Sequence, residues 1–153
     1  TVEGLHQVSG IYGFQNDYRW LSNFAWCKVI YEDVEYPTVE HAYVAAKTDN
    51  TRRKVLISMA ATPAEAKRMG KNPTHIRSDW ESVKQDVMFE LLVQKYSQPK
   101  FMELLLDTGD QYIEETNHWN DTFWGVCNGV GENRLGKMIM DIREHLIDIT
   151  RNT

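Results

Sequence analysis

The chain has 153 residues, of which 42% are hydrophobic and 25% are charged, and its formal net charge is −5. This length and composition are typical of a globular protein with a hydrophobic core, so we expect one domain over residues 1–153. The acidic balance disfavours tight non-specific binding to nucleic acid, which depends on the neutralisation of phosphates. The apolar runs are only a few residues long, so we expect no membrane-spanning helix and no membrane partner.

The two cysteines, Cys27 and Cys127, lie far apart and match no metal-ligand or redox spacing. The five histidines stand singly, without a helical pair or a cysteine partner. We therefore expect no metal and no cofactor. No secretory signal pattern is visible, which favours a reducing, cytoplasmic location. A long-range disulfide is the alternative that the sequence leaves open.

The first part of the chain predicts two strands. Aromatic-rich and β-branched sequence favours strands at residues 8–14 and 27–36, the second with a turn at Glu32 and Asp33. Residues 18–24, between the strands, follow neither the helical nor the strand period, so we expect a loop there.

Helix signals dominate the middle of the chain. Thr38, which follows a proline, is predicted to cap one helix. Residues 62–65, Thr-Pro-Ala-Glu, combine an N-cap, a proline in the first turn and a capping-box glutamate, and Gly70 predicts the end of that helix. Ser78 and Glu81 predict a second capping box, which opens a long amphipathic helix.

The last third continues the pattern. We expect a short helix at residues 98–106, a short strand at 111–115 and a final helix at 133–149 with an apolar stripe. The predicted class is therefore α+β and mostly helical, with a small sheet. The strands are too few and too scattered for repeated βαβ units.

Charge is unevenly distributed along the chain. Residues 52–77 hold seven basic residues against one acid, whereas residues 101–153 hold ten acids against four bases. The basic segment predicts either a face that binds a phosphorylated ligand or a nucleic-acid backbone, or an ordinary solvated helix surface.

A carboxylate, an aromatic ring and an amine fall on one face of the helix after Thr38. Glu40 and Lys47 are seven residues apart, about two turns, with Tyr43 between them. A carboxylate can stabilise charge at a sugar carbon or activate water, and a desolvated lysine can form a Schiff base or bind phosphate. The structural alternative is an acid in the first helical turn and an exposed lysine two turns on. His41 is more typical of a structural histidine than of a catalyst.

A second cluster joins aromatic and polar residues at 117–125, with the sequence Asn-His-Trp-Asn-Asp-Thr-Phe-Trp-Gly. Its rings can stack on a planar base, and its Asn and Asp residues can read ribose hydroxyls or base edges. Asp121 is the candidate acid or base. The same sequence is also typical of an aromatic turn in which Asn and Asp are turn formers.

Together these motifs resemble the NADAR superfamily, which includes the YbiA-like N-glycosidases of riboflavin-pathway intermediates. The motifs occur in order over about residues 11–147. The matching residues are Trp20 to Phe24; Tyr36 to His41 with Tyr43, Ala46 and Lys47; Ala66, Lys67 and Gly70; Trp80, Lys84, Val87 and Met88; Leu104 to Gly109; Trp119 to Asp121 with Phe123, Trp124 and Gly125; and Asn133 to Gly136 with Met140 and Arg143. The chain departs from some members at residues 126–128, where those members have further glycines.

The resemblance implies a compact, largely helical domain that hydrolyses the bond between ribose C1 and a nitrogen of a base or amino-pyrimidine. It implies catalytic roles for Glu40, Lys47 and Asp121, with Lys47 as the Schiff-base lysine of members that remove ADP-ribose from guanine. The substrate-binding positions that it implies are Trp20, Asn23, Phe24, His41, Tyr43, Trp80, Trp119, Asn120, Trp124 and Asn133.

Two substrates fit this leading hypothesis of an N-glycosidase. One is a small ribosylamino-pyrimidine phosphate, and the other is ADP-ribosyl-guanine, which would make ADP-ribosylated nucleic acid a partner. The alternative class is a non-catalytic module that binds ADP-ribose or a nucleotide, in which Lys47 only binds phosphate.

Overall fold

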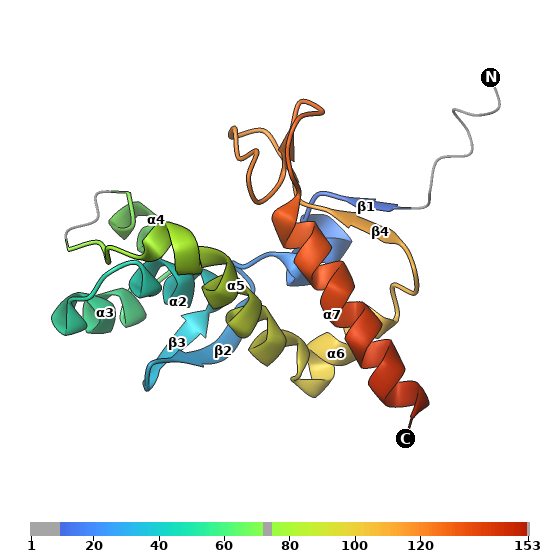
Figure 1. The fold of residues 1–153 in the computed structure, drawn as a ribbon, viewed down its shortest axis with the longest axis horizontal. Helices are drawn as coiled ribbons and strands as arrows, with labels where there is room; N and C mark the ends of the chain where they lie inside the picture. Colours follow the sequence, from blue (N-terminus) through green and yellow to red (C-terminus); the bar gives the residue numbers. More distant parts are fainter. Residues whose placement is uncertain (1–9, 72–74, 153) are drawn as a thin grey trace. The chain divides into compact units, whose positions relative to one another are not determined.

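The computed structural model describes residues 10–71 and 75–152. The chain divides into two compact units, whose elements are labelled in Figure 1. The central unit runs from Ser22 to Gln98, and the terminal unit combines Thr1–Leu21 with Pro99–Thr153. Within the two described ranges, no helix is both long enough and apolar enough to cross a membrane.

The central unit begins with a β-hairpin. Strand β2 (Trp26–Tyr31) pairs antiparallel with β3 (Val34–Thr38). Glu32 and Asp33, between the strands, have φ angles of 48° and 69°. Two consecutive left-handed residues form the tight turn whose twist matches that of a hairpin. The strand predicted at 27–36 and its turn are therefore confirmed.

Four helices follow the hairpin in the described part of the central unit (Figure 1): α2 (Val39–Ala46), α3 (Thr51–Ser58), α4 (Pro63–Met69) and α5 (Trp80–Tyr96). Helix α2 packs against the other three helices and against both strands. Seven of its eight residues are buried, and the exception is Glu40. The helix that carries the predicted site is thus the core element of this unit.

The capping predictions are confirmed at Thr38 and Thr62 and wrong at Ser78. Each threonine hydroxyl accepts a hydrogen bond of 3.1 Å from the backbone N–H three residues further on. Helix α5 instead begins after Asp79, which makes no side-chain capping hydrogen bond. The Asp79 carboxylate is bound by the guanidinium of Arg77, and this ion pair replaces the cap.

Helix α3 has no counterpart among the predicted elements. Ile57 is its only buried residue, so its sequence lacks the apolar periodicity that marks an amphipathic helix. The signal that was available is a capping one, since Asn50 Oδ1 accepts from the Arg53 N–H at 2.9 Å. The predicted end of α4 is confirmed, with Gly70 at its C-cap.

The terminal unit combines short parallel strand pairs with two helices and a 3-10 helix. Its elements are β1 (Gly10–Tyr12) parallel to β4 (Tyr112–Glu114), β5 (Thr116–Asn117) parallel to β6 (Val126–Cys127), the 3-10 helix Asn16–Leu21, α6 (Pro99–Leu106) and α7 (Arg134–Arg151). Helix α7 packs against β4 and α6.

Most predicted elements of this unit are present with shifted ends. The strand expected at 8–14 is observed at Gly10–Tyr12, and residues 8 and 9 lie outside the described residues. The expected loop at 18–24 starts within the 3-10 helix and continues as turns. The strand expected at 111–115 and the helices expected at 98–106 and 133–149 are confirmed.

The predicted class, α+β and mostly helical, is confirmed. The described residues form three two-stranded sheets rather than one larger sheet, and helices make up most of the regular structure. Cys27 and Cys127 are both buried and neither forms a disulfide, so the structure does not contain the disulfide that the sequence left open.

Candidate active site

The cluster predicted on α2 is assembled in the central unit. Tyr43 is 8% exposed and packs against Trp80 of α5, with the ring centroids 5.1 Å apart. The Nζ atom of Lys47 lies 5.6 Å from the centroid of the Tyr43 ring. Glu40 is half-buried, about one turn before Tyr43. The carboxylate, the aromatic wall and the amine therefore share one helix face.

Burial is the main influence on the amine of Lys47, and it lowers the pKa from its usual value of 10.5. Glu40 opposes this shift, because a nearby negative charge favours the ammonium form and raises the pKa. Lys84 lowers the pKa of Lys47 further, and Glu81 raises it. A lysine whose pKa is lowered holds more neutral amine near neutral pH, and the neutral amine is the nucleophilic form.

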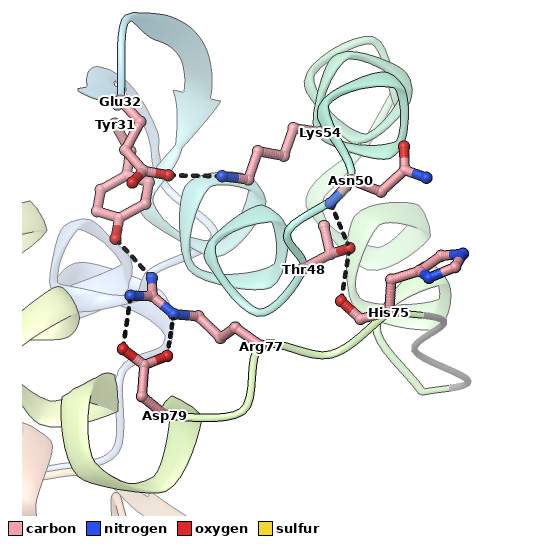
Figure 2. Close-up of polar contacts among 8 residues, drawn as sticks. All are labelled: Tyr31, Glu32, Thr48, Asn50, Lys54, His75, Arg77 and Asp79. Atoms are coloured by element: carbon pink, nitrogen blue, oxygen red, sulfur yellow. Dashed lines mark hydrogen bonds and ion pairs between the residues drawn. The ribbon is translucent and has the colours of Figure 1, made fainter.

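The backbone at Lys47 is held by the chain that leads into α5. The Arg77 N–H donates to the Lys47 carbonyl at 2.8 Å, and Thr48 forms an isolated antiparallel bridge with Ile76. The Thr48 hydroxyl also donates to the His75 carbonyl at 3.1 Å (Figure 2). These contacts fix the end of α2 that carries the candidate nucleophile.

Arg77 connects this brace to the hairpin and to α5. Its Nε and Nη2 atoms donate to the two carboxylate oxygens of Asp79 at 2.6 and 3.0 Å, and Nη1 donates to the Tyr31 hydroxyl at 3.1 Å (Figure 2). The hydrogen bond from Arg77 is the largest cause that holds the pKa of Asp79 below its usual value. The sequence analysis missed this brace, because the apparent capping box at Ser78 obscured the Arg-Ser-Asp spacing.

Asn23 is attached to the site helix through its backbone. Its carbonyl accepts the Glu40 N–H at 3.1 Å, and its Nδ2 donates to Met88 Sδ at 3.7 Å. Its Oδ1 is buried and has no hydrogen-bond partner among the described residues. A buried acceptor next to Glu40 suits a donor group of a ligand. The following residue, Phe24, has Lys67 Nζ 5.9 Å from its ring centroid.

His41 lies in the core, with 0% of its surface exposed. Its Nδ1 is 2.7 Å from the Thr38 hydroxyl, and its Nε2 is 3.0 Å from the Ala60 carbonyl. Burial lowers the pKa of His41, an effect that the bond to Ala60 partly offsets. Both ring nitrogens are thus engaged within the protein, which is the geometry of a structural histidine.

In the terminal unit, Asp121 organises the predicted aromatic loop. Its Oδ1 accepts the N–H groups of Phe123 at 3.1 Å and Trp124 at 2.8 Å. Asn117 closes the same turn, because its Oδ1 accepts the Asp121 N–H at 3.1 Å and its Nδ2 donates to the Asp121 carbonyl at 2.9 Å. These two residues therefore act as turn formers, as one interpretation of the sequence predicts.

The rings and amides of this unit differ in exposure. Trp119 is 52% exposed, and an exposed ring of this size offers a stacking surface. Trp124 is half-buried in an edge contact with Phe123, with centroids 4.8 Å apart. Asn120 is exposed in a left-handed conformation, with φ at 68°. Trp20, on the 3-10 helix, is half-buried.

Asn133 is a brace between α7 and β4. It is 2% exposed, its Oδ1 accepts the Glu115 N–H at 3.0 Å, and its Nδ2 donates to the Ile113 carbonyl at 3.0 Å. The next turn of α7 needs a glycine, because a Cβ on Gly136 would lie 2.3 Å from the Ile113 oxygen. The side chain of Asn133 is thus committed to bonds within the protein.

The structure gathers the central-unit candidates around α2. In the terminal unit, Trp119, Asn120, Asp121 and Trp124 lie in the loop, Asn133 is the N-cap residue of α7, and Trp20 lies on the 3-10 helix. Within residues 10–71 and 75–152, no group of three or more His, Cys, Asp or Glu side chains is placed to hold a metal ion. The candidate side chains themselves are carboxylates, an amine, an imidazole, amides and aromatic rings.

Comparison with known proteins identifies the family. The NADAR domain model matches residues 12–147, and this range includes residues of both compact units. The chain belongs to the NADAR family. The match covers every segment on which the resemblance rested, from Trp20 to Arg143.

Two similar curated proteins carry functional names. The N-glycosidase YbiA of Shigella boydii serotype 4 (strain Sb227) is 36% identical over 142 residues, which are 91% of this chain and 88% of that protein. The riboflavin biosynthesis protein VVA0006 of Vibrio vulnificus (strain YJ016) is 33% identical over 141 residues, 89% of this chain and 38% of that protein.

The fold has a counterpart among solved structures. The NMR structure of the E. coli protein YbiA is similar with a TM-score of 0.82 and 33% sequence identity, over 94% of this chain and 87% of that chain. The predicted YbiA-like fold is therefore confirmed. The predicted enzyme class, an N-glycosyl hydrolase, is also confirmed by these relatives, and none of them favours a non-catalytic binding module.

Proposed function

We propose that this NADAR protein hydrolyses the bond between ribose C1 and a nitrogen of a ribosylamino-pyrimidine phosphate. The observation that carries the proposal is the face of α2, on which Glu40, Tyr43 and a lysine of lowered pKa, Lys47, stand together. The relative named a riboflavin biosynthesis protein supports a substrate from that pathway. The family match over residues 12–147 supports the proposal of one catalytic domain over residues 1–153, and a cytoplasmic location is part of the same proposal.

Glu40 stabilises the positive charge that builds on C1. As the C1–N bond breaks, its electron pair leaves with the base, which takes up a proton. The oxygen of water then bonds to C1, and the products are a ribose phosphate and the free amino-pyrimidine. A half-buried carboxylate is suited to this role, because its charge is less screened than it would be in bulk water.

Lys47 supplies a covalent route. The ribose ring opens, the neutral amine adds to C1, and the base leaves with its electron pair and a proton, which leaves a C=N bond to Lys47. Water then adds to C1 and displaces the amine, which regenerates Lys47 and releases the sugar. Every step is an addition or an elimination that leaves C1 at the same oxidation level, so no oxidant or reductant is required.

The remaining candidates bind and orient. Asn23 Oδ1 accepts a hydrogen bond from the substrate. Asp121, in the terminal unit, is a candidate acid or base in addition to its role as a turn former. His41 and Asn133 act by holding other groups in place, since their side chains are engaged within the protein. The other candidates for substrate binding are Phe24, Tyr43 and Trp80 in the central unit and Trp20, Trp119, Asn120 and Trp124 in the terminal unit.

A second candidate substrate is ADP-ribosyl-guanine in nucleic acid. The observation that favours it is the basic segment 52–77, in which Arg68 and Lys71 are exposed at the end of α4. Exposed basic side chains of this kind can contact several phosphates of a nucleic-acid backbone. Cleavage of such a substrate would fall steeply with salt, whereas cleavage of a small phosphate would fall little.

The proposal is tested by following base release by mass spectrometry. The protein is incubated with a ribosylamino-pyrimidine phosphate and, separately, with DNA that carries ADP-ribosylated guanosine. Glu40→Gln and Lys47→Ala should each lower turnover of the true substrate by on the order of 10² or more. Near-normal turnover in both variants, or no base release from either substrate, would contradict the proposal.

A further inference from the structure

A pocket opens between α2, α3 and the end of α4 in the central unit. It is a shallow, open cleft, because its cavity volume is only about 10 Å³, which is room for one water, and the remaining space is continuous with solvent. Val44, Ile57 and Met69 give it apolar walls, and Lys47 and Arg53 bring two cationic side chains. The other lining residues, Thr48 and Gly70, add no charge, so the pocket is basic without a carboxylate of its own.

Arg53 is fixed at the wall of this pocket. Its Nη2 donates to the Met69 carbonyl at 3.0 Å, which ties the guanidinium to the end of α4. Its backbone N–H is bound by the N-cap residue Asn50 at 2.9 Å, which sets the start of α3. One of the five guanidinium N–H donors is used in the bond to Met69, and the others remain for a ligand of the matching geometry.

Two other basic residues of the segment 52–77 already form ion pairs with acidic side chains. Lys54 pairs with Glu32, and Arg77 pairs with Asp79 (Figure 2). Neither of these ion pairs lines the pocket. The structure therefore separates Arg53 from Lys54 and Arg77, two other basic residues of the segment 52–77.

We propose that this pocket is a phosphate subsite in which Arg53 is the principal ligand. The planar guanidinium can form two parallel hydrogen bonds to phosphate oxygens at the mouth of the cleft. The identity of the ligand rests on the proposed function, which makes it the phosphate of a ribosyl substrate. The same chemistry would hold a phosphate of ADP-ribose.

The subsite has a consequence for Lys47, which lines the same pocket while its amine lies beside Tyr43. If Arg53 binds the phosphate, Lys47 is not needed as the phosphate ligand and its amine is available for C1. Arg53 thus determines specificity for phosphorylated substrates, and Lys47 performs the covalent step.

The direct test is the binding of ribose 5-phosphate and of ADP-ribose, each measured by isothermal titration calorimetry. Arg53→Gln should lower the affinity for whichever of the two ligands the wild type binds more tightly by about tenfold or more. Arg53→Lys should lower this affinity less, because the charge is kept. The matched control is Arg52→Gln, which removes the same charge from the exposed neighbour on α3 and should change the affinity less than about twofold. Circular dichroism verifies that each variant is folded.

A kinetic test separates the subsite from the proposed reaction. With the phosphorylated substrate, Arg53→Gln should raise KM by about tenfold or more with little change in kcat, and with the dephosphorylated nucleoside it should change neither. If no base is released, the proposed function fails, while the calorimetric comparison still decides the subsite. Equal affinities of wild type, Arg53→Gln and Arg52→Gln, or no binding of either ligand, would overturn the inference.

Discussion

We predict that the stability of this protein rises with pH above neutrality, because Lys95 of α5 is buried. Its side chain is fully buried, its Nζ donates to the Ser22 carbonyl at 2.9 Å, and it lies 5.3 Å from the centroid of the Tyr96 ring. Burial lowers the pKa of Lys95 from 10.5 to about 7, and the neighbouring Cys27 offsets only part of this shift. Lys95 also supports the site, because it bonds to Ser22, and the next residue, Asn23, bonds to the backbone of Glu40.

The size of the effect follows from the two pKa values. Between about pH 7 and the unfolded value of 10.5, the unfolded chain holds a proton on Lys95 that the folded chain has released. The free energy of unfolding therefore rises with pH in this window. One pKa unit corresponds to about 1.4 kcal/mol, so this single group should add about 2 kcal/mol between about pH 7 and pH 9.

Lys95→Met tests this reasoning, because it keeps most of the side-chain volume and removes the titrating group. The variant should lose the pH dependence, although the Ser22 carbonyl that loses its donor can cost about 1–3 kcal/mol at every pH. The measurement is urea unfolding of wild type and variant at about pH 7, 8 and 9. Lys28→Met, at an exposed position of β2, is the matched control and should keep the wild-type slope.

The comparison of slopes decides the outcome, since absolute stabilities also reflect the lost hydrogen bond. If wild type and Lys95→Met show the same change of unfolding free energy over this pH range, then the buried amine does not titrate as the structure implies. A wild-type stability that falls between about pH 7 and pH 9 would refute the reasoning outright.

Three further predictions concern the site and its supports. Glu40→Gln should lower the pH at which the Lys47 amine becomes reactive, because the Glu40 carboxylate raises the pKa of Lys47 and the variant lacks it. The check is the pH dependence of amine modification, followed by mass spectrometry. Arg77→Met keeps the backbone N–H that bonds Lys47 but removes the side-chain bonds to Asp79 and Tyr31 that hold this segment. The variant should lower turnover by on the order of tenfold, which steady-state kinetics would detect and an unchanged kcat would contradict. Gly125→Ala should destabilise the protein by about 1–3 kcal/mol, since the new Cβ would lie 2.1 Å from the Glu115 carbonyl oxygen; an unchanged melting temperature would show that the loop adjusts freely.

The elements that sequence predicts well are those with local causes. The turn at Glu32 and Asp33 and the caps at Thr38 and Thr62 each depend on residues within about four positions, and all are observed. The face of α2 follows from helical periodicity, so the neighbourhood of Tyr43 and Lys47 was also predictable.

The features that sequence did not predict depend on distant partners. The parallel pairing of β1 with β4 joins residues about 100 positions apart, for which a single sequence carries no local signal. The predicted cap at Ser78 is wrong because Arg77 binds Asp79. Helix α3 was not predicted because it buries only Ile57 and so lacks an apolar periodicity. The engagement of both His41 nitrogens likewise requires the Ala60 carbonyl, which only the fold brings close.

The central claim is that Lys47 attacks ribose C1, and trapping the covalent intermediate tests it most directly. Borohydride added during turnover of the ribosylamino-pyrimidine phosphate should reduce the Schiff base and leave a stable sugar adduct, located by peptide mass spectrometry at Lys47. Lys47→Arg keeps the charge and should give no adduct and no turnover. Full turnover without any adduct on Lys47, or retained activity in Lys47→Arg, would contradict the account.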